Sequence, residues 1–271
     1  MPRSAESLPE GQPTGPARAF FLAGPPRGGR AELAPEEARH AVQVLRMRAG
    51  DELLGLDGQG GVWPLRVLAA GRELELEVSG SARHEPAPGA PGALLPWIEV
   101  GLSLPRGSRA EDCVGRLVQL GVAALQPLVC ERTQGADREL GTARRRRLER
   151  AVDEACKQSG RAWRAEVRAP LPAGEFATRE AGALALLAPG ASERLADWAL
   201  RSPDAARADE RAPLLLAIGP EGGWTAAEEQ RFLARGAARV ALGPFVLRIE
   251  TAAEAAAAVL AHALFRPAST R

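Results

Sequence analysis

The chain has 271 residues, of which 45% are hydrophobic, so it is long enough for one large domain or for two smaller ones with cores of their own. Its 35 basic and 34 acidic residues leave a net charge of +1, so attraction of nucleic acid by overall charge is excluded and a local basic patch would be needed. The three cysteines, Cys113, Cys130 and Cys156, are too few and too widely spaced for a zinc cluster or a disulfide scaffold, and they favour a reducing compartment.

The amino terminus and the hydropathy of the chain argue against export. Residues 1–17 lack the apolar run of a signal peptide, and we expect them to form a disordered tail. No segment approaches the length that is needed to cross a bilayer. We therefore predict a cytoplasmic protein that makes no contact with a membrane.

Residues 18–82 have the pattern of a small, mostly β domain. A helix is predicted over Pro35–Met47, where apolar residues recur on one side, and the glycine-rich turn Asp57–Gly61 separates two strands. The predicted strands are Arg18–Ala23, Glu52–Leu56, Val62–Ala69 and Glu73–Val78. We expect these elements to form a small barrel with one helix.

Residues 83–96 are rich in proline, glycine and alanine and are predicted to be a semi-rigid linker. From residue 97 to residue 271 strands alternate with helices, which predicts an α/β domain with a parallel sheet that is covered on both faces. The expected strands are Trp97–Leu104, Ala124–Val129, Ala183–Leu187, Leu214–Ile218 and Arg239–Leu242. The expected helices are Arg109–Leu120, Thr142–Gln158, Ser192–Arg201, Thr225–Arg235 and Thr251–Phe265.

The segment Leu214–Ile218 has no polar residue, as expected of a central strand that is buried on both faces. It is followed by the glycine-rich sequence Gly219–Gly223 and by a helix whose start has a capping-box spacing, Thr225 with Glu228. Glycines at the carboxyl end of a central strand let the backbone approach a ligand closely. The alternative is a tight turn that binds nothing.

The next predicted strand ends in a second loop of similar character, Leu242–Thr251. Thr251 and Glu254 give another capping-box spacing at the start of the final helix. Arg248 and Glu250 lie beside the start of this helix. Packing alone is a poor explanation for an arginine and a glutamate at such a position. We therefore expect the two loops to form one composite pocket.

Two segments, Leu214–Glu228 and Leu242–Ala252, resemble the two signature loops of the ribosomal RNA small subunit methyltransferase E family. The resemblance extends over nearly the whole chain from Arg18 onward. Weaker matches occur in the right order at Val44–Met47 with Asp57–Gly58, at Gln119–Val122 with Pro127 and Glu131–Arg132, and at Gln158–Arg161.

The resemblance implies a fold and an activity. Members of this family methylate N3 of a uridine in small-subunit (16S) ribosomal RNA during ribosome biogenesis, and they take the methyl group from S-adenosylmethionine. Their carboxyl-terminal domain is a SPOUT-type parallel sheet with a trefoil knot, and their amino-terminal domain is a PUA-like barrel that helps to bind RNA. They act as homodimers, with the cofactor near the subunit interface.

The same resemblance implies that the two loops hold the adenosyl part of the cofactor largely through backbone groups. Uracil N3 carries a proton at neutral pH, so a base is needed, and Glu221 and Glu250 are the candidates. Arg248 is the candidate partner for the negative charge that develops on uracil, or for a phosphate. Alternatively, Glu221 could hydrogen-bond loop amides and Glu250 could complement a helix dipole. The expected cofactor-binding residues are Leu187, Ile218, Gly219, Pro220, Glu221, Gly222, Gly223, Leu242, Gly243, Pro244, Val246, Leu247, Arg248 and Thr251.

Local charge suggests where RNA could bind. The stretch Asp137–Arg168 holds ten basic and six acidic residues, although a solvated helix face would have the same composition. The candidate RNA-binding residues are Arg46, Arg48, Arg132, Arg144, Arg145 and Arg161. The three histidines stand in unlike contexts, so we expect no metal site.

The chain departs from the family pattern at four positions. Phe245 stands where members usually carry arginine, Ile249 where they carry threonine, Gln119 where they carry glutamate, and Arg116 where they carry lysine. These differences keep two alternatives open: an RNA-binding or ribosome-assembly protein without catalysis on the same fold, and a methyltransferase that acts on a different RNA.

Overall fold

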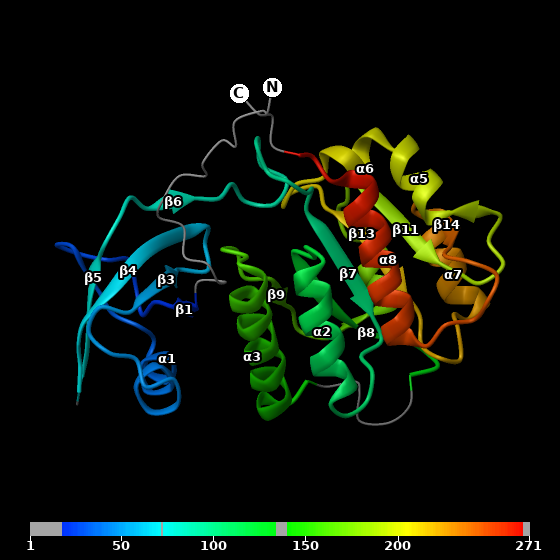
Figure 1. Ribbon diagram of the computed structural model, residues 1–271. Helices are drawn as coiled ribbons and strands as arrows, with labels where there is room; N and C mark the ends of the chain where they lie inside the picture. Colours follow the sequence, from blue (N-terminus) through cyan, green and yellow to red (C-terminus); the bar gives the residue numbers. More distant parts are fainter. Residues whose placement is uncertain (1–17, 72, 134–139, 268–271) are drawn as a thin grey trace, which may run out of the picture. The chain divides into compact units, whose positions relative to one another are not determined.

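The computed structural model describes residues 18–71, 73–133 and 140–267 (Figure 1). The predicted tail, residues 1–17, and Arg138 of the basic stretch lie outside these ranges. The chain forms two compact units, one that ends near residue 83 and a second that continues from His84 and also includes residues 58–60. Each unit has its own sheet.

The first unit is a small β-barrel with one helical segment. The sheet order is β1-β3-β4-β5-β2, and an antiparallel bridge between Leu22 and Leu33 joins the two ends of this order. The elements are β1 (Ala19–Phe21), β2 (Arg30–Ala31), β3 (Glu52–Leu56), β4 (Gly61–Ala70), β5 (Leu74–Val78) and α1 (Pro35–Arg39), which continues as the π-helical turn His40–Val44. This bridge brings the two ends of the sheet together around an apolar core, as the strand pattern predicted.

The second unit contains all remaining elements after the short strand β6 (Arg83–His84). Its strands are β7 (Ile98–Leu102), β8 (Ala124–Val129), β9 (Glu166–Val167), β10 (Leu171–Pro172), β11 (Ala183–Leu187), β12 (Glu193–Arg194), β13 (Leu214–Ile218) and β14 (Ala238–Ala241). Its helices are α2 (Arg109–Gln119), α3 (Thr142–Ser159), α4 (Ala173–Phe176), α5 (Leu195–Arg201), α6 (Pro203–Arg207), α7 (Ala226–Ala234) and α8 (Ile249–Leu264).

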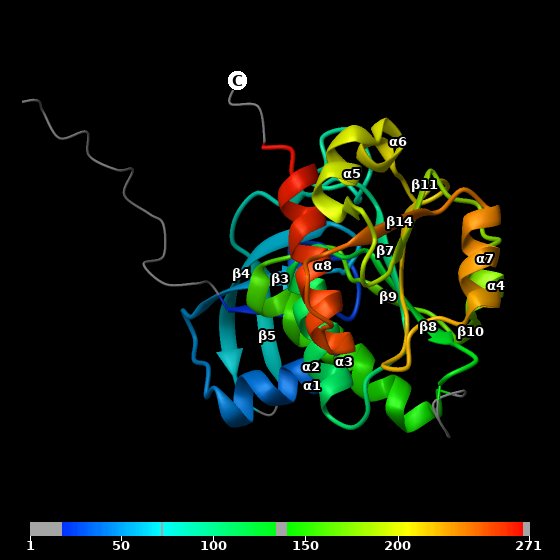
Figure 2. The same cartoon turned by 90° about the vertical axis from the view of Figure 1, so that its right-hand side faces the viewer.

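The sheet of the second unit is parallel throughout, with the order β10-β8-β7-β13-β11-β14-β12 and β9 also paired with β8. Every residue of β13 is buried, as its uninterrupted apolar sequence predicted. Helices cover both faces: α4 and α7 lie on one side, and α2, α3 and α8 on the other (Figure 2). The carboxyl ends of β8, β7 and β13 are therefore neighbours along one edge.

The two predicted helix caps have different outcomes. The capping box at Thr225 and Glu228 is present. The second prediction is wrong, because α8 begins two residues before Thr251, where the carbonyl of Arg248 already accepts a hydrogen bond from the N–H of Ala252 at 2.8 Å. Glu254 instead accepts a hydrogen bond from Arg116 of α2.

Within the described ranges, no helix combines the length and the apolar character that crossing a lipid bilayer requires.

A buried ion pair lies in the middle of the parallel sheet. The Glu99 side chain on β7 is fully buried, and its carboxylate accepts hydrogen bonds from both terminal nitrogens of Arg179. A third nitrogen, Nη2 of Arg168, lies 3.3 Å from the same carboxylate. These arginines compensate the cost of burying the charge.

We expect Glu99→Ala to lower the free energy of unfolding by about 3 kcal/mol, because removing one partner of a buried pair leaves the other charges uncompensated. Urea denaturation followed by circular dichroism measures the change. Glu154, whose partner Lys157 lies 2.7 Å away and whose own side chain is 75% exposed, provides the control. Glu154→Ala should cost no more than about 0.5 kcal/mol, and equal losses in the two variants would contradict a structural role for the Glu99 pair.

Candidate functional site

The loops after β13 and β14 meet in one pocket, as the sequence predicted. We call it the apolar pocket; its cavity volume is about 130 Å³. It lies at the carboxyl ends of adjacent parallel strands, where ligand sites of such sheets usually form. Its lining consists of Leu187, Ala188, Pro189, Ile218, Gly219, Pro220, Glu221, Gly223, Trp224, Ala241, Leu242, Gly243, Phe245, Val246, Leu247, Ile249 and Ala252.

Most of the predicted cofactor residues are in this lining, but four are not. Pro244, Arg248 and Thr251 lie outside it, and Gly222 lines a neighbouring pocket instead. Arg248 is the residue before α8 and Thr251 lies in the first turn, where both are exposed. Residues 187–189, after β11, form a wall of which the sequence prediction included only Leu187.

The glycine-rich loop has a defined backbone conformation. Gly223 has φ +68°, which favours glycine, and its N–H donates to the carbonyl of Pro220 at 2.8 Å to close a tight turn. Gly219 lies against the indole ring of Trp224. The indole Nε1 of Trp224 donates to the carbonyl of Leu187 at 3.1 Å, and its ring packs on Phe232. The loop is thus fixed to the end of β11 as well as to its own strand.

A buried carboxylate joins this loop to the loop after β8. One oxygen of Glu228 accepts the N–H of Thr225 at 2.9 Å, and the other accepts the N–H of Glu131 at 2.8 Å. The connection is reciprocal, since Arg132 donates to the carbonyls of Gly222 at 2.6 Å and of Trp224 at 3.2 Å. Two charged side chains therefore set the distance between the two loops through backbone groups.

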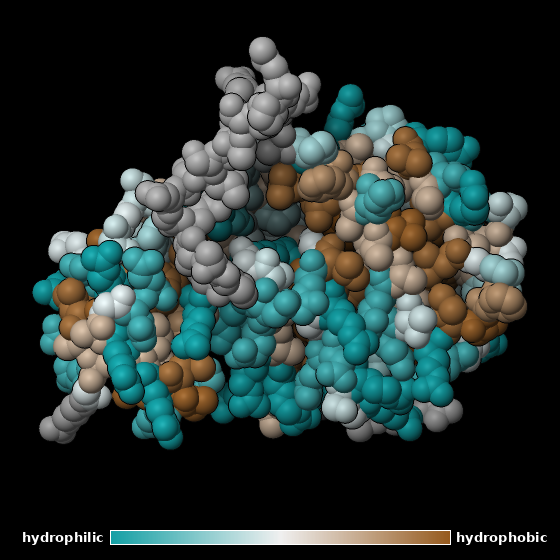
Figure 3. Space-filling view, viewed as in Figure 1, coloured by the Kyte–Doolittle hydropathy of each residue, from teal (hydrophilic) through white to brown (hydrophobic). Residues whose placement is uncertain are grey.

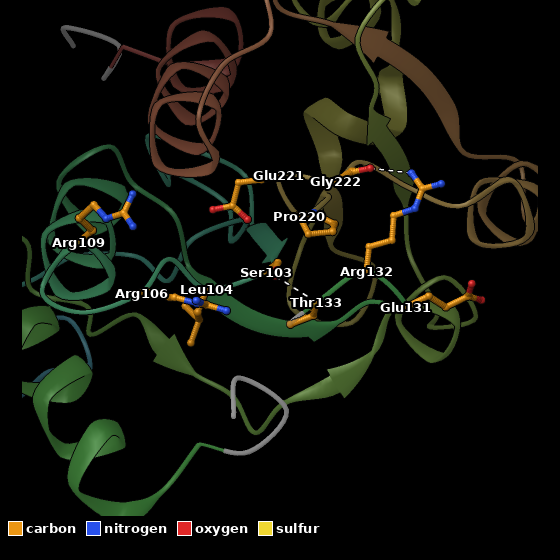
Figure 4. Close-up of a pocket in the computed structure, with 10 residues that line it drawn as sticks. All are labelled: Ser103, Leu104, Arg106, Arg109, Glu131, Arg132, Thr133, Pro220, Glu221 and Gly222. Atoms are coloured by element: carbon orange, nitrogen blue, oxygen red, sulfur yellow. Dashed lines mark hydrogen bonds between the residues drawn. The ribbon is translucent and has the colours of Figure 1, made fainter. Parts of the chain in front are cut away.

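A second pocket, which we call the polar pocket, lies beside the first and has a volume of about 690 Å³ (Figure 4). Its lining consists of Ser103, Leu104, Arg106, Arg109, Glu131, Arg132, Thr133, Pro220, Glu221 and Gly222. Pro220 and Glu221 line both pockets and form their shared wall. In Figure 4 the Glu221 side chain extends from the glycine-rich loop toward the side that Arg109 lines, whereas Glu131 points away.

The structure separates the two candidate bases. Glu221 is exposed at the shared wall. Glu250 lies in the first turn of α8 and accepts a hydrogen bond from Arg109 at 3.2 Å. Its own backbone N–H, with help from Arg109, lowers the pKa of Glu250 below the ordinary value of 4.5. Its charge therefore stabilises the folded chain at pH values above the ordinary pKa, and that contribution is lost as the pH falls below it.

Most of the arginines predicted to bind RNA have partners inside the protein. Arg132 holds the glycine-rich loop, and Arg144 donates to the carbonyl of Pro105. Arg145 is hydrogen-bonded to Glu149 and to the carbonyl of Val167. Arg161 donates to the carbonyls of Val118 and Val122 near the end of α2, and burial lowers its pKa. These four contacts are structural, which a count of charges along the sequence does not reveal.

Two predicted RNA contacts remain at the surface of the first unit. Arg46 and Arg48 are both exposed, and Arg46 has φ +52°, a left-handed conformation that is uncommon outside glycine. Their role in RNA binding stays a prediction.

No group of three or more metal-ligating side chains occurs among the residues that the structure describes. The three cysteines are buried and free, and burial raises the pKa of Cys113 and of Cys130 to about 12. Burial therefore keeps the thiols of Cys113 and Cys130 protonated near neutral pH.

The sequence matches two family models. Residues 93–261 match an RNA methyltransferase domain, and residues 33–78 match an RNA methyltransferase PUA domain. The ribosomal RNA small subunit methyltransferase E of Synechocystis is 34% identical over 228 residues, covering 81% of this chain and 69% of the relative. That of Mycobacterium bovis is 31% identical over 242 residues, covering 86% of each.

The chain belongs to the ribosomal RNA small subunit methyltransferase E family.

Solved structures agree with this assignment. The family member from Neisseria gonorrhoeae, crystallised with S-adenosyl methionine, is 27% identical and covers 90% of this chain and 96% of its own, with a TM-score of 0.74. A Legionella pneumophila protein in complex with the same cofactor is also 27% identical, covers 91% and 98%, and gives a TM-score of 0.75. The predicted fold class, a parallel α/β domain after a PUA-like barrel, is confirmed. The passage of the chain through a knot stays a prediction.

The contact between Gly219 and Trp224 gives a test of the loop. A Cβ atom at position 219 would lie 2.9 Å from the indole ring, so Gly219→Ala must displace Trp224 from Leu187. We expect a loss of about 1–3 kcal/mol in the free energy of unfolding, the usual cost of overpacking. Gly243→Ala is the matched control in the other loop, where a Cβ would meet nothing within 4 Å. Tryptophan fluorescence during urea unfolding reports both, and a fully stable Gly219→Ala variant would contradict the described packing.

Proposed function

We propose that this protein transfers the methyl group of S-adenosylmethionine to N3 of a uridine in 16S ribosomal RNA. The observation that carries the proposal is the shared wall of the two pockets, where the carboxylate of Glu221 stands between an apolar site and a polar one. A methyl donor on one side and a nucleotide on the other would meet at this carboxylate.

The residues of the apolar pocket fit the cofactor. Aliphatic side chains from both loops, with Leu187 of β11, provide contacts for an adenine ring, and the backbone of the two loops provides hydrogen-bonding groups. The cofactor carries a positive sulfonium, and Glu221 is the acidic side chain in the lining. When bound, S-adenosylmethionine supplies an electrophilic methyl group, so this chain has mainly to position the acceptor.

The acceptor atom nevertheless needs a base. Glu221 takes the proton from N3 as N3 forms a bond to the methyl carbon and the bond between that carbon and sulfur breaks, which leaves a neutral thioether and a methylated base. Because Glu221 is exposed, the proton then passes to water. The charges balance over the whole step: the positive charge of the sulfonium is lost when it becomes a thioether, and one proton is released to water.

The other two candidate catalytic residues have different roles in this proposal. A carboxylate whose pKa is lowered is a weaker base, so Glu250 orders the start of α8 and complements its dipole. Arg248 is exposed next to Leu247, which lines the apolar pocket. From there it can meet a phosphate or the negative charge on uracil once RNA is bound.

A homodimer is part of the proposal. Hydrophobic side chains gather over α5 and α8 in Figure 3, and Leu200 of α5 is 68% exposed. Such a surface favours association with a second copy.

The proposal also includes a location: an enzyme whose substrate is ribosomal RNA acts in the cytoplasm.

The proposal is tested by the RNA of a strain that lacks the gene. N3 methylation blocks the pairing edge of uracil, so reverse transcription of wild-type 16S RNA should stop one nucleotide before the target, and the stop should vanish in the deletion strain. Mass spectrometry of the same RNA identifies the modified base. An unchanged stop pattern would exclude this reaction. A methylated base that disappears from another RNA instead would show that the protein is a methyltransferase with a different substrate.

The role of Glu221 has its own test. We expect Glu221→Gln to lower kcat for methyl transfer to 16S RNA about 100-fold, because general-base catalysis is lost. Cofactor affinity by calorimetry should fall by no more than about fivefold, because an exposed carboxylate that faces the sulfonium contributes about 1 kcal/mol at most. Glu229→Gln, which removes a half-buried carboxylate paired with Arg239 outside both pockets, is the control and should keep the wild-type rate. Absence of cofactor binding by the wild-type protein would instead support an RNA-binding protein without catalysis, the alternative that Phe245 and Ile249 leave open.

A further inference from the structure

The polar pocket is built from the carboxyl ends of three neighbouring strands. Ser103 and Leu104 follow β7, Glu131 to Thr133 follow β8, and Pro220 to Gly222 follow β13. Because β8, β7 and β13 are adjacent in the sheet, segments far apart in the sequence converge on one space. Neither of the two loops from which the methyltransferase site was predicted accounts for the β7 and β8 side of this space.

The pocket is graded from buried hydroxyls to exposed cations. Ser103 and Thr133 are 4% and 9% exposed, and their hydroxyl oxygens lie 3.3 Å apart. Arg106 is exposed, and the side chain of Arg109 is 47% exposed. Figure 4 places both arginines on the side of the pocket opposite Arg132. Hydroxyls that donate and accept lie inside, and guanidinium groups line the mouth.

This gradient matches a nucleotide. The edge of a pyrimidine carries carbonyl oxygens that hydroxyls can bind, whereas a phosphate is best bound by the planar donors of arginine. Arg132 holds the carbonyls of Gly222 and Trp224 and lies across the pocket from Arg106 and Arg109, so we assign the phosphate to that pair. Of the two acidic side chains in the lining, Glu131 points away and Glu221 faces the pocket, so the mouth is positive while the shared wall is negative.

We propose that the polar pocket holds the target nucleotide, with its base against Ser103, Thr133 and Glu221 and its phosphate on Arg106 and Arg109. This inference rests on the proposed methyl transfer, because it places N3 at the wall that the apolar pocket shares. It assigns Arg106 and Arg109 to substrate binding, a role that the charge pattern of the sequence gave to other arginines.

Arg109 also connects the two pockets. It donates to Glu250 in the first turn of α8, and Ile249 and Ala252 of the same turn line the apolar pocket. A phosphate on Arg109 would therefore act on the helix that borders the cofactor. One turn or more further along, Arg116 of α2 makes an equivalent pair with Glu254 of α8 at 2.9 Å but lines neither pocket.

The two pairs supply a matched experiment. Filter binding measures the affinity of the full chain for unmodified 16S RNA, transcribed in vitro, at several KCl concentrations without cofactor. We expect Arg106→Gln and Arg109→Gln each to weaken binding about tenfold, as expected for a hydrogen bond to a charged group, and to reduce the slope of log Kd against log salt by about 0.7. Arg116→Gln loses an ion pair between the same helices and should keep the wild-type affinity and slope.

The outcomes separate this inference from the proposed reaction. If the wild type transfers methyl groups and both pocket variants keep its affinity and salt slope, the nucleotide site is wrong while the reaction stands. If Arg116→Gln weakens binding as much as Arg109→Gln, the effect is due to helix packing and the site is again wrong. If the wild type transfers nothing but the pocket variants alone lose affinity, the site stands and the reaction fails. Circular dichroism melting curves show whether each variant is still folded, so that a lost RNA contact is distinguished from unfolding. Arg106→Gln is a further control, because it leaves the ion pair between Arg109 and Glu250 intact.

Discussion

The site depends on one buried carboxylate. Glu228 accepts hydrogen bonds from backbone N–H groups on either side of it, one at the start of α7 and one in the loop after β8. A carboxylate with its side chain out of water must satisfy its oxygens locally. The two loops therefore cannot separate without leaving one buried oxygen of Glu228 without a donor. This requirement holds Pro220 and Glu221 at the boundary of the two pockets. Arg132 applies the same constraint in the opposite direction, because its guanidinium binds carbonyls of the glycine-rich loop.

Two pockets of opposite character can share a wall only if that wall is thin and rigid. A loop of five residues with a tight turn at Pro220 to Gly223 provides such a wall, and the indole of Trp224 supports it from behind. The rigidity has a catalytic meaning, because transfer between two bound molecules is fast only when the reacting atoms are held in line. Glu228 and Arg132, whose partners are backbone groups of the protein, therefore contribute to holding the reacting atoms in line as directly as side chains that contact a substrate.

The sequence predicted the frame of the second unit well, and the reason is physical. Buried parallel strands are rich in apolar residues, so β11 and β13, which are wholly apolar, have the predicted bounds, and so does β8, where Gln126 is the polar residue. Two-residue strands such as β9, β10 and β12 have no periodicity to detect. The polar pocket was missed because its walls are about 30 and 90 positions apart and meet only through strand order. The available signal was a polar residue at or shortly after the end of each strand: Ser103 after β7, Glu131 after β8 and Glu221 after β13. The roles of the arginines could not be predicted, because carbonyl partners leave no mark in the sequence.

The substitution at position 245 changes how charge is distributed around the site. Phe245 lines the apolar pocket and is 80% exposed, at a position where relatives usually carry arginine. A cation there would add to the positive potential near the sulfonium, which repels it, and would compete for Glu221. With phenylalanine at position 245, the arginines that line the two pockets all belong to the polar one, where the proposed nucleotide would bind. The exposed ring instead offers a flat apolar face at the rim, on which a base can stack without regard to its identity. In the proposed arrangement Arg106 and Arg109 attract the RNA, so the absence of an arginine at position 245 does not conflict with the proposed reaction.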